Sequence, residues 1–217
     1  SGVGVYVYGV ELDGSMLIDY SVRLRAVDSL VDVPVNGSQT DTGVGGEVRG
    51  NYCTLNPLNS QAATFSNGNL QYATTSIGKI FGTIAVNSGK WYWEAQNLSS
   101  NSLASMVNGI GRIDGNPTTY GGGSPGDYAW LTRSNSGSPS SAYNNGNLIS
   151  YGNIAVAQYA VVGIAFNADV GTLEFFVDGV SQGVAWNTIP VSSSLFYAPI
   201  AGDPNSSTDT DGSINFG

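Results

Sequence analysis

The stretch Val161–Val180, VVGIAFNADVGTLEFFVDGV, decides how this chain folds. Two runs rich in apolar and β-branched residues, Ala160–Asn167 and Thr172–Asp178, flank the connection ADVG, whose residue types are typical of a tight turn. Asp178-Gly179 then supplies a second turn that leads into Val180–Trp186. The stretch therefore predicts three consecutive antiparallel strands.

The same pattern of short strands and turns continues on both sides of this stretch. No segment shows helical periodicity over more than two turns, and two long loops rich in Gly, Ser and Asn are expected at 114–126 and 133–147. Strand signals spaced in this way predict an all-β sandwich or barrel. The further strands are expected at Ala63–Leu70, Gly78–Val86, Lys90–Gln96, Val107–Ile113, Tyr128–Thr132, Leu195–Ala201 and Ser213–Gly217.

Four motifs, in the correct order, resemble those of SPRY domains. They are Gly89–Glu94 (GKWYWE), Val107–Arg112 (VNGIGR), the Val161–Val180 stretch and Leu195–Pro199 (LFYAP). The resemblance covers about residues 50–217. It implies an antiparallel β-sandwich of two sheets, the SPRY or concanavalin-like jelly roll, over residues 51–217.

A narrower resemblance concerns the beginning and the end of this region. Asn51–Leu58 and Phe65–Leu70 resemble the entry segment of SPRY-type domains in tail and fibre proteins of tailed phages, and Ile214–Gly217 resembles their last strand. Upstream, Asp28–Pro34 fits the same pattern. The resemblance implies an extracellular virion protein of the phage tail, with other virion proteins as partners and a homotrimer as its oligomeric state.

Residues 1–33 are expected to form a hairpin that turns at Asp13-Gly14 and to be the end of an upstream region. Residues 34–50 contain little core material and many Gly, Ser and Thr residues, so a linker is expected there. Because the chain begins with Ser1 rather than Met, we expect it to be a piece of a longer polypeptide. The longest apolar run, Ile154–Phe166, is too short for a membrane helix, and no membrane insertion is expected.

The negative net charge of the chain argues against nucleic acid as a partner. The net charge is −9, and only seven residues are Lys or Arg. Nucleic-acid binding requires a cationic surface that displaces counterions, so nucleic acid is not an expected partner.

The chain is not expected to be an enzyme. It contains no His and a single Cys, Cys53, which removes the Ser-His-Asp triad and the usual zinc ligands. Glu94 and Glu174 lie in predicted strands, where we expect them to face solvent or to pair across the sheet. The alternative, a glycan-degrading enzyme, requires two carboxylates about 5–10 Å apart across a groove, and the loop residues Asp114 and Asp127 are free to serve.

No cofactor is expected, with calcium as the alternative. Asp209-Thr210-Asp211-Gly212-Ser213 resembles part of a calcium loop, with oxygen ligands Asp209 and Asp211 at alternate positions. The acidic residue that closes a full loop is missing, so a solvated hairpin loop is favoured over a metal site.

Aromatic residues divide into a strand group and a loop group. The strand group is expected in the core and consists of Trp91, Trp93, Phe175, Phe176 and Trp186. Aromatic rings on loops, flanked by Asn and Ser, are typical of glycan or protein recognition, and nearby Asn and Arg side chains would add hydrogen bonds. Packing of these loops onto the sandwich is the alternative. The candidate ligand-binding residues are Tyr120, Tyr128, Trp130, Arg133, Tyr143, Asn144, Asn145 and Tyr151.

Together these features predict a non-enzymatic structural and adhesion module of a virion, located in a phage tail fibre or tail appendage. Its loops would contact a host-surface glycan or protein, or neighbouring subunits. Two alternatives remain open: a carbohydrate- or protein-binding module of a secreted cellular protein, and a capsid decoration protein.

Overall fold

The computed structural model describes residues 10–12, 15–17, 42–43, 46–47, 53–60, 63–99, 105–133, 140–149, 151–152, 154–204 and 210–216. Every regular element in these ranges is a β-strand. The chain divides into two compact units, Ser1–Tyr52 and Cys53–Phe216, which we describe one at a time. No helix long and apolar enough to cross a membrane occurs within the described ranges.

The described residues of the first unit form two pairs of short strands. Strands β1 (Val10–Leu12) and β2 (Ser15–Leu17) pair antiparallel, with Leu12 opposite Ser15. The expected linker contains two further strands, β3 (Thr42–Gly43) and β4 (Gly46–Glu47), which also pair antiparallel. The remaining positions of the 1–33 hairpin lie outside the described residues.

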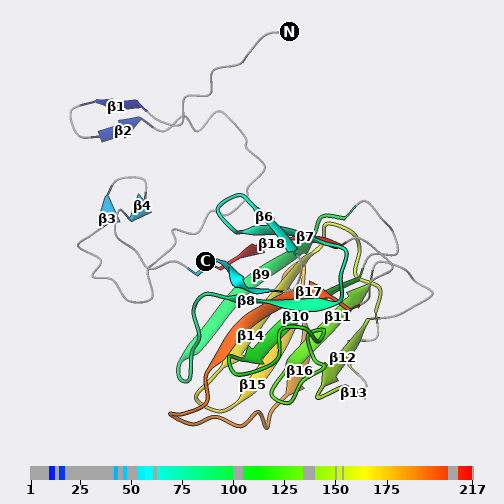
Figure 1. Ribbon diagram of the computed structural model, residues 1–217. Helices are drawn as coiled ribbons and strands as arrows, with labels where there is room; N and C mark the ends of the chain where they lie inside the picture. Colours follow the sequence, from blue (N-terminus) through cyan, green and yellow to red (C-terminus); the bar gives the residue numbers. More distant parts are fainter. Residues whose placement is uncertain are drawn as a thin grey trace. The chain divides into compact units, whose positions relative to one another are not determined.

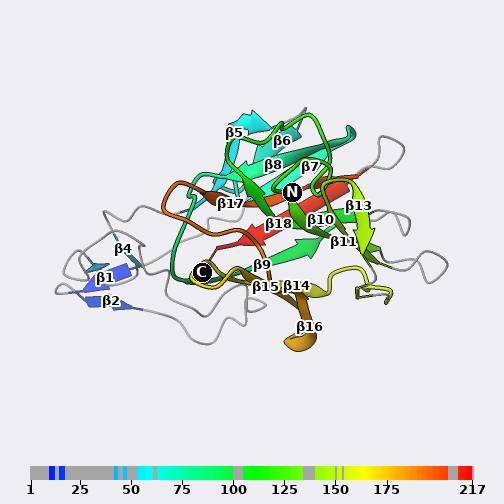
Figure 2. The same ribbon diagram turned by 90° about the horizontal axis from the view of Figure 1, so that it is seen from below.

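The second unit is a sandwich of two seven-stranded antiparallel sheets, which confirms the predicted fold class (Figures 1 and 2). The first sheet has the order β13 (Asn147–Ile149), β12 (Ser141–Asn144), β11 (Tyr128–Arg133), β10 (Ser105–Arg112), β17 (Tyr197–Asp203), β8 (Gly78–Gly82), β5 (Leu55–Ser60). The second sheet has the order β16 (Val180–Trp186), β15 (Thr172–Val177), β14 (Val161–Asn167), β9 (Lys90–Asn97), β18 (Thr210–Asn215), β7 (Gln71–Thr74), β6 (Ala63–Ser66).

The stretch that decides the fold forms the predicted strands β14, β15 and β16. Asn167 lies opposite Thr172, and the N–H of Gly171 donates to the Asn167 carbonyl, which closes the ADVG turn. Between β15 and β16, Asp178 and Gly179 have φ angles of 48° and 79°. Both values lie in the left-handed region that a type I′ hairpin turn requires.

The main core lies between the two sheets. Strand alternation points Val162, Ile164 and Phe166 of β14 into it, together with Trp93 and Phe175, as predicted for the last two. Trp91 and Trp186 are half-buried and pack against the same core. The prediction for Phe176 is wrong, because alternation along β15 turns its ring to the opposite face, where it meets the 45% exposed Tyr92 edge to face.

The first sheet is buried on its other face as well. A second apolar cluster there comprises Phe81, Val107, Ala129, Leu131, Ala198 and Ile200. The glycine-rich segment 113–127 covers it: a Cβ on Gly121 would lie 2.3 Å from Val107 Cγ1 and 3.1 Å from Ile200 Cδ1. The expected loop is therefore packed against the sheet, and it forms one side of the candidate site.

Candidate functional site

Segment 113–127 is organised by local turns. The side-chain oxygen of Asn116 accepts hydrogen bonds from the backbone N–H and the hydroxyl of Thr118, at 2.9 and 2.8 Å. The Gly123 N–H donates to the Tyr120 carbonyl at 2.9 Å. Such short-range bonds are the reason that Asn, Thr and Gly favour turns, and they give this segment a defined course over the sheet.

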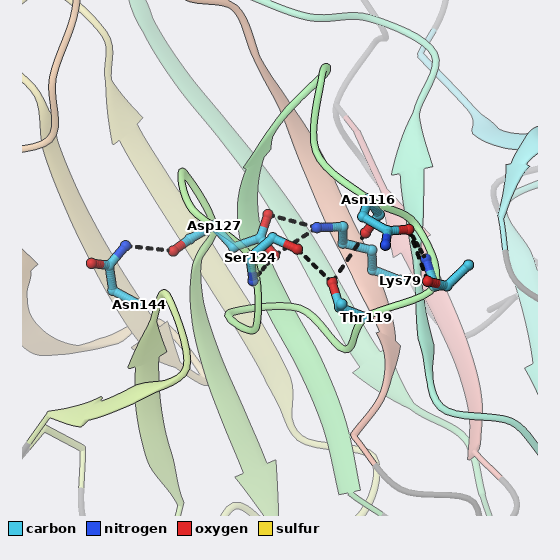
Figure 3. Close-up of polar contacts among 7 residues, drawn as sticks. Lys79, Asn116, Thr119, Ser124, Asp127 and Asn144 are labelled. Carbon is cyan, nitrogen blue, oxygen red and sulfur yellow. Dashed lines mark hydrogen bonds and ion pairs between the residues drawn. The ribbon is translucent and has the colours of Figure 1, made fainter.

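A buried ion pair fixes this segment to the sheet (Figure 3). Lys79 Nζ on β8 donates to both carboxylate oxygens of Asp127, at 2.8 and 2.6 Å, and neither side chain has exposed surface. Asp127 also accepts a hydrogen bond from the Ser124 N–H, at 3.1 Å. The backbone N–H of Lys79 donates to the Pro117 carbonyl at 3.2 Å, so the segment is bound to Lys79 at two places, Pro117 and Asp127.

Burial acts on both partners of the ion pair. It raises the pKa of Asp127 and lowers the pKa of Lys79, while their mutual hydrogen bonds act in the opposite direction on each. A buried charge without its partner is costly, so each side chain depends on the other. The ion pair thus makes the position of the covering segment a condition of stable folding.

The same contacts correct the view of Asp127 as a free loop carboxylate. It is sealed from solvent by Lys79 and cannot flank a cleft. Asp114 is exposed and pairs with Arg112.

Two further residues considered for chemistry lie elsewhere in the sandwich. Glu94 accepts a hydrogen bond from the Tyr92 hydroxyl at 2.9 Å. Burial raises the pKa of the Cys53 thiol.

Four of the predicted ligand-binding residues come together beside the ion pair. The rings of Tyr120 and Tyr143 meet edge to face, with 6.0 Å between their centroids. Asn144 Nδ2 donates to the Asp127 carbonyl at 2.7 Å, and the exposed Asn145 follows in the turn between β12 and β13, with φ of 50°. We call the half-buried Tyr120 and Tyr143 together with Asn145 the Tyr120–Tyr143 surface.

A backbone hydrogen bond connects this hairpin to the covering segment. The Gly146 N–H donates to the Gly122 carbonyl at 2.7 Å, and a Cβ on Gly122 would lie 2.7 Å from Tyr143 Cβ. The two parts of the Tyr120–Tyr143 surface are therefore packed directly on each other.

Tyr128, Trp130 and Tyr151 face the space between the sheets instead. Tyr128 and Trp130 lie on β11 rather than on a loop, and alternation turns both inward, where Trp130 is completely buried. Trp130 is therefore a core residue and no longer a candidate ligand contact. The Tyr151 ring packs on Trp130 at 5.8 Å, its hydroxyl donates to the Gly183 carbonyl, and burial raises its pKa to about 12.

Arg133 lies away from the Tyr120–Tyr143 surface. Along β11 it pairs with Ser105 at one end of β10, whereas Tyr128 pairs with Ile110 near the other end. The eight predicted residues thus divide into four that come together beside the ion pair, three that face the core and one arginine at the other end of β11.

The alternative of a calcium site concerns Asp209 and Asp211. Asp209 lies outside the described residues, and Asp211 lies in β18, opposite Ala73 of β7. In the part of the chain that the structure describes, no three Cys, Asp or Glu side chains are grouped closely enough to hold a metal ion.

Comparison with solved structures identifies the fold. The chain is similar to the SPRY domain of human HERC1, with a TM-score of 0.60 and 19% identity, over 75% of this chain and 97% of that one. It is also similar to the PSpry domain of TRIM65, with a TM-score of 0.58 and 12% identity, over 76% and 91% of the two chains. The sandwich therefore has the SPRY fold. No family model matches the sequence, and no curated protein matches it.

Proposed function

We propose that this chain is a non-enzymatic binding module that uses the Tyr120–Tyr143 surface to contact a host-surface ligand or a neighbouring subunit. One observation carries the proposal: the surface is assembled by contacts within the chain itself, through the buried Lys79–Asp127 pair and the Gly146–Gly122 backbone bond. A surface ordered in advance loses little conformational entropy on binding.

The chemistry of the surface suits recognition rather than catalysis. Tyrosine rings offer apolar area together with a polar hydroxyl, and asparagine supplies both a donor and an acceptor. Asn145 is exposed in the turn two residues after Tyr143, so its amide is accessible to a partner. Glycans and protein loops both present the hydroxyl and amide groups that such a surface binds.

The proposed setting is the tail of a phage virion, in a fibre or related appendage. It is supported by the resemblance of Asn51–Leu58 and Ile214–Gly217 to the corresponding segments of phage tail proteins. Fibres are commonly built from three copies, so a homotrimer is part of the proposal. A capsid decoration protein and a module of a secreted cellular protein are the alternatives.

Binding of the fluorescently labelled chain to cells of the host bacterium tests the surface. Tyr120→Ala is expected to weaken cell binding by about tenfold or more, as loss of a central aromatic contact does. Asn145→Asp, which keeps a residue that tolerates positive φ, is expected to weaken binding without disturbing packing.

Tyr159→Ala is the matched control, because Tyr159 is 54% exposed and its N–H bonds to Asn97 at the far end of β9. Equal binding by wild type, Tyr120→Ala and Asn145→Asp, with all three folded, would exclude the Tyr120–Tyr143 surface as the contact.

A further inference from the structure

A recess separate from the Tyr120–Tyr143 surface lies at the end of the sandwich where β14 turns into β15. It has a volume of about 400 Å³ and opens to solvent. Three connections contribute its lining, which consists of Asn87, Ser88, Ala168, Asp169, Val191, Ser192 and Ser193. It shares no residue with the Tyr120–Tyr143 surface.

We propose that this recess binds a neutral saccharide unit. The inference goes beyond the proposed function, because it concerns different residues and holds whether or not the chain belongs to a virion.

The frame of the recess is fixed by hydrogen bonds between the three connections. Asp169 Oδ1 accepts from the Gly89 N–H at 2.7 Å, and the Ala168 N–H donates to the Gly89 carbonyl at 2.8 Å. Asn87 Nδ2 donates to the Ser193 carbonyl at 3.0 Å. The lining groups are therefore held in place before any ligand arrives.

The chemistry of the lining selects the class of ligand. Three serines, one asparagine and one aspartate line the recess together with the small apolar residues Ala168 and Val191. A carboxylate has about four acceptor positions, so Asp169 retains capacity for ligand hydroxyl donors beyond its bond to Gly89. Hydroxyl-rich ligands with apolar C–H faces match this combination of groups.

Charge excludes the competing class of small ligand. Among the described residues that line the recess there is no Lys or Arg, and the Asp169 carboxylate would repel a phosphate or a carboxylate group. The volume falls within the usual range for small-ligand sites, about 300–1,000 Å³. Since the recess is open, a terminal sugar of a longer glycan has access to it.

NMR titration of the isotope-labelled full chain tests the proposal with defined probes. Glucose, galactose, mannose and N-acetylglucosamine would be added separately at millimolar concentration, and inorganic phosphate in parallel. We expect at least one of the four sugars to shift the backbone amide signals of Gly89, Asp169 and Ser193, and phosphate to leave them unchanged. No shift at these amides with any of the four sugars, or equal shifts with phosphate, would overturn the proposal.

Substitutions inside and outside the recess test whether the sugar-induced shifts arise from binding in the recess. Ser193→Phe places a ring in the recess and is expected to abolish the sugar-induced shifts, whereas Ser66→Phe, at an exposed position of β6 outside the recess, is expected to retain them. Asp169→Asn keeps an acceptor for the Gly89 N–H and is expected to weaken sugar binding several-fold. Unchanged shifts in Ser193→Phe would contradict the proposal. Cell binding lost in Tyr120→Ala, with sugar shifts retained, would show that the two sites are independent.

Discussion

Replacing Lys79 with methionine is expected to lower the free energy of unfolding by about 3–5 kcal/mol, because Asp127 would remain buried without its counter-charge. Methionine keeps the length of the side chain and its apolar packing, so the loss reports the charge rather than a cavity. Urea denaturation followed by tryptophan fluorescence measures the effect.

The double variant Lys79→Met, Asp127→Asn separates the ion pair from its surroundings. Asparagine still offers an acceptor to the Ser124 N–H, so the double variant is expected to be more stable than the sum of the two single changes implies. The control is Lys90→Met, which removes an exposed lysine from β9 and is expected to change stability by less than about 0.5 kcal/mol. Additive effects, or a Lys79→Met variant as stable as the control, would show that the pair does not fix the covering segment.

Replacing Gly109 with alanine is expected to cost about 3 kcal/mol or more, because the new Cβ meets the backbone of the neighbouring strand. An added Cβ would lie 2.1 Å from the Tyr128 carbonyl oxygen and 2.8 Å from Ala129 Cα. Those atoms belong to β11, which pairs with β10 along its whole length, so the clash is relieved only by separating two central strands.

Gly68→Ala is the matched control for this substitution. Gly68 has a φ of 65°, and an added Cβ would find no atom within 4 Å. Alanine at this position is expected to lower the free energy of unfolding by about 1–2 kcal/mol, which is the cost of the left-handed conformation alone. Thermal or urea unfolding compares the two variants, and equal losses would mean that β10 and β11 are less tightly packed than the structure shows.

The strands could be predicted from the sequence because each is specified by neighbouring residues. In Val161–Val180, the alternating apolar residues that specify each strand lie within a few positions of the turn residues that end it. Such short-range patterns can be read directly from a sequence. The resemblance to SPRY domains implied that these strands form a sandwich of two antiparallel sheets, and the solved SPRY structures have the same fold.

The candidate site was predicted only in part, because its key contact is not local. Lys79 and Asp127 are 48 residues apart, and either residue alone is usually a solvated surface charge. Trp130 was misplaced because its neighbourhood is rich in loop residues, although β11 itself alternates inward and outward. Tyr120 and Tyr143 were identified from their residue type, but their contact depends on how segment 113–127 folds over the sheet.

The proposed virion setting rests on the resemblance of Asn51–Leu58 and Ile214–Gly217 to segments of phage tail proteins. Sandwiches of this kind occur in proteins of different settings, and function resides in the surfaces that each sequence builds on them. The Tyr120–Tyr143 surface and the proposed saccharide recess share no residue. We therefore expect a substitution in one of these sites to abolish binding there and to leave binding at the other site unchanged.

Electron microscopy of phage particles labelled with gold-conjugated antibody against this chain tests the central claim most directly. We predict gold at the tail appendages, together with inhibition of adsorption by the same antibody. Labelling of the head would favour the capsid decoration protein, and particles without any label would contradict a role in the virion.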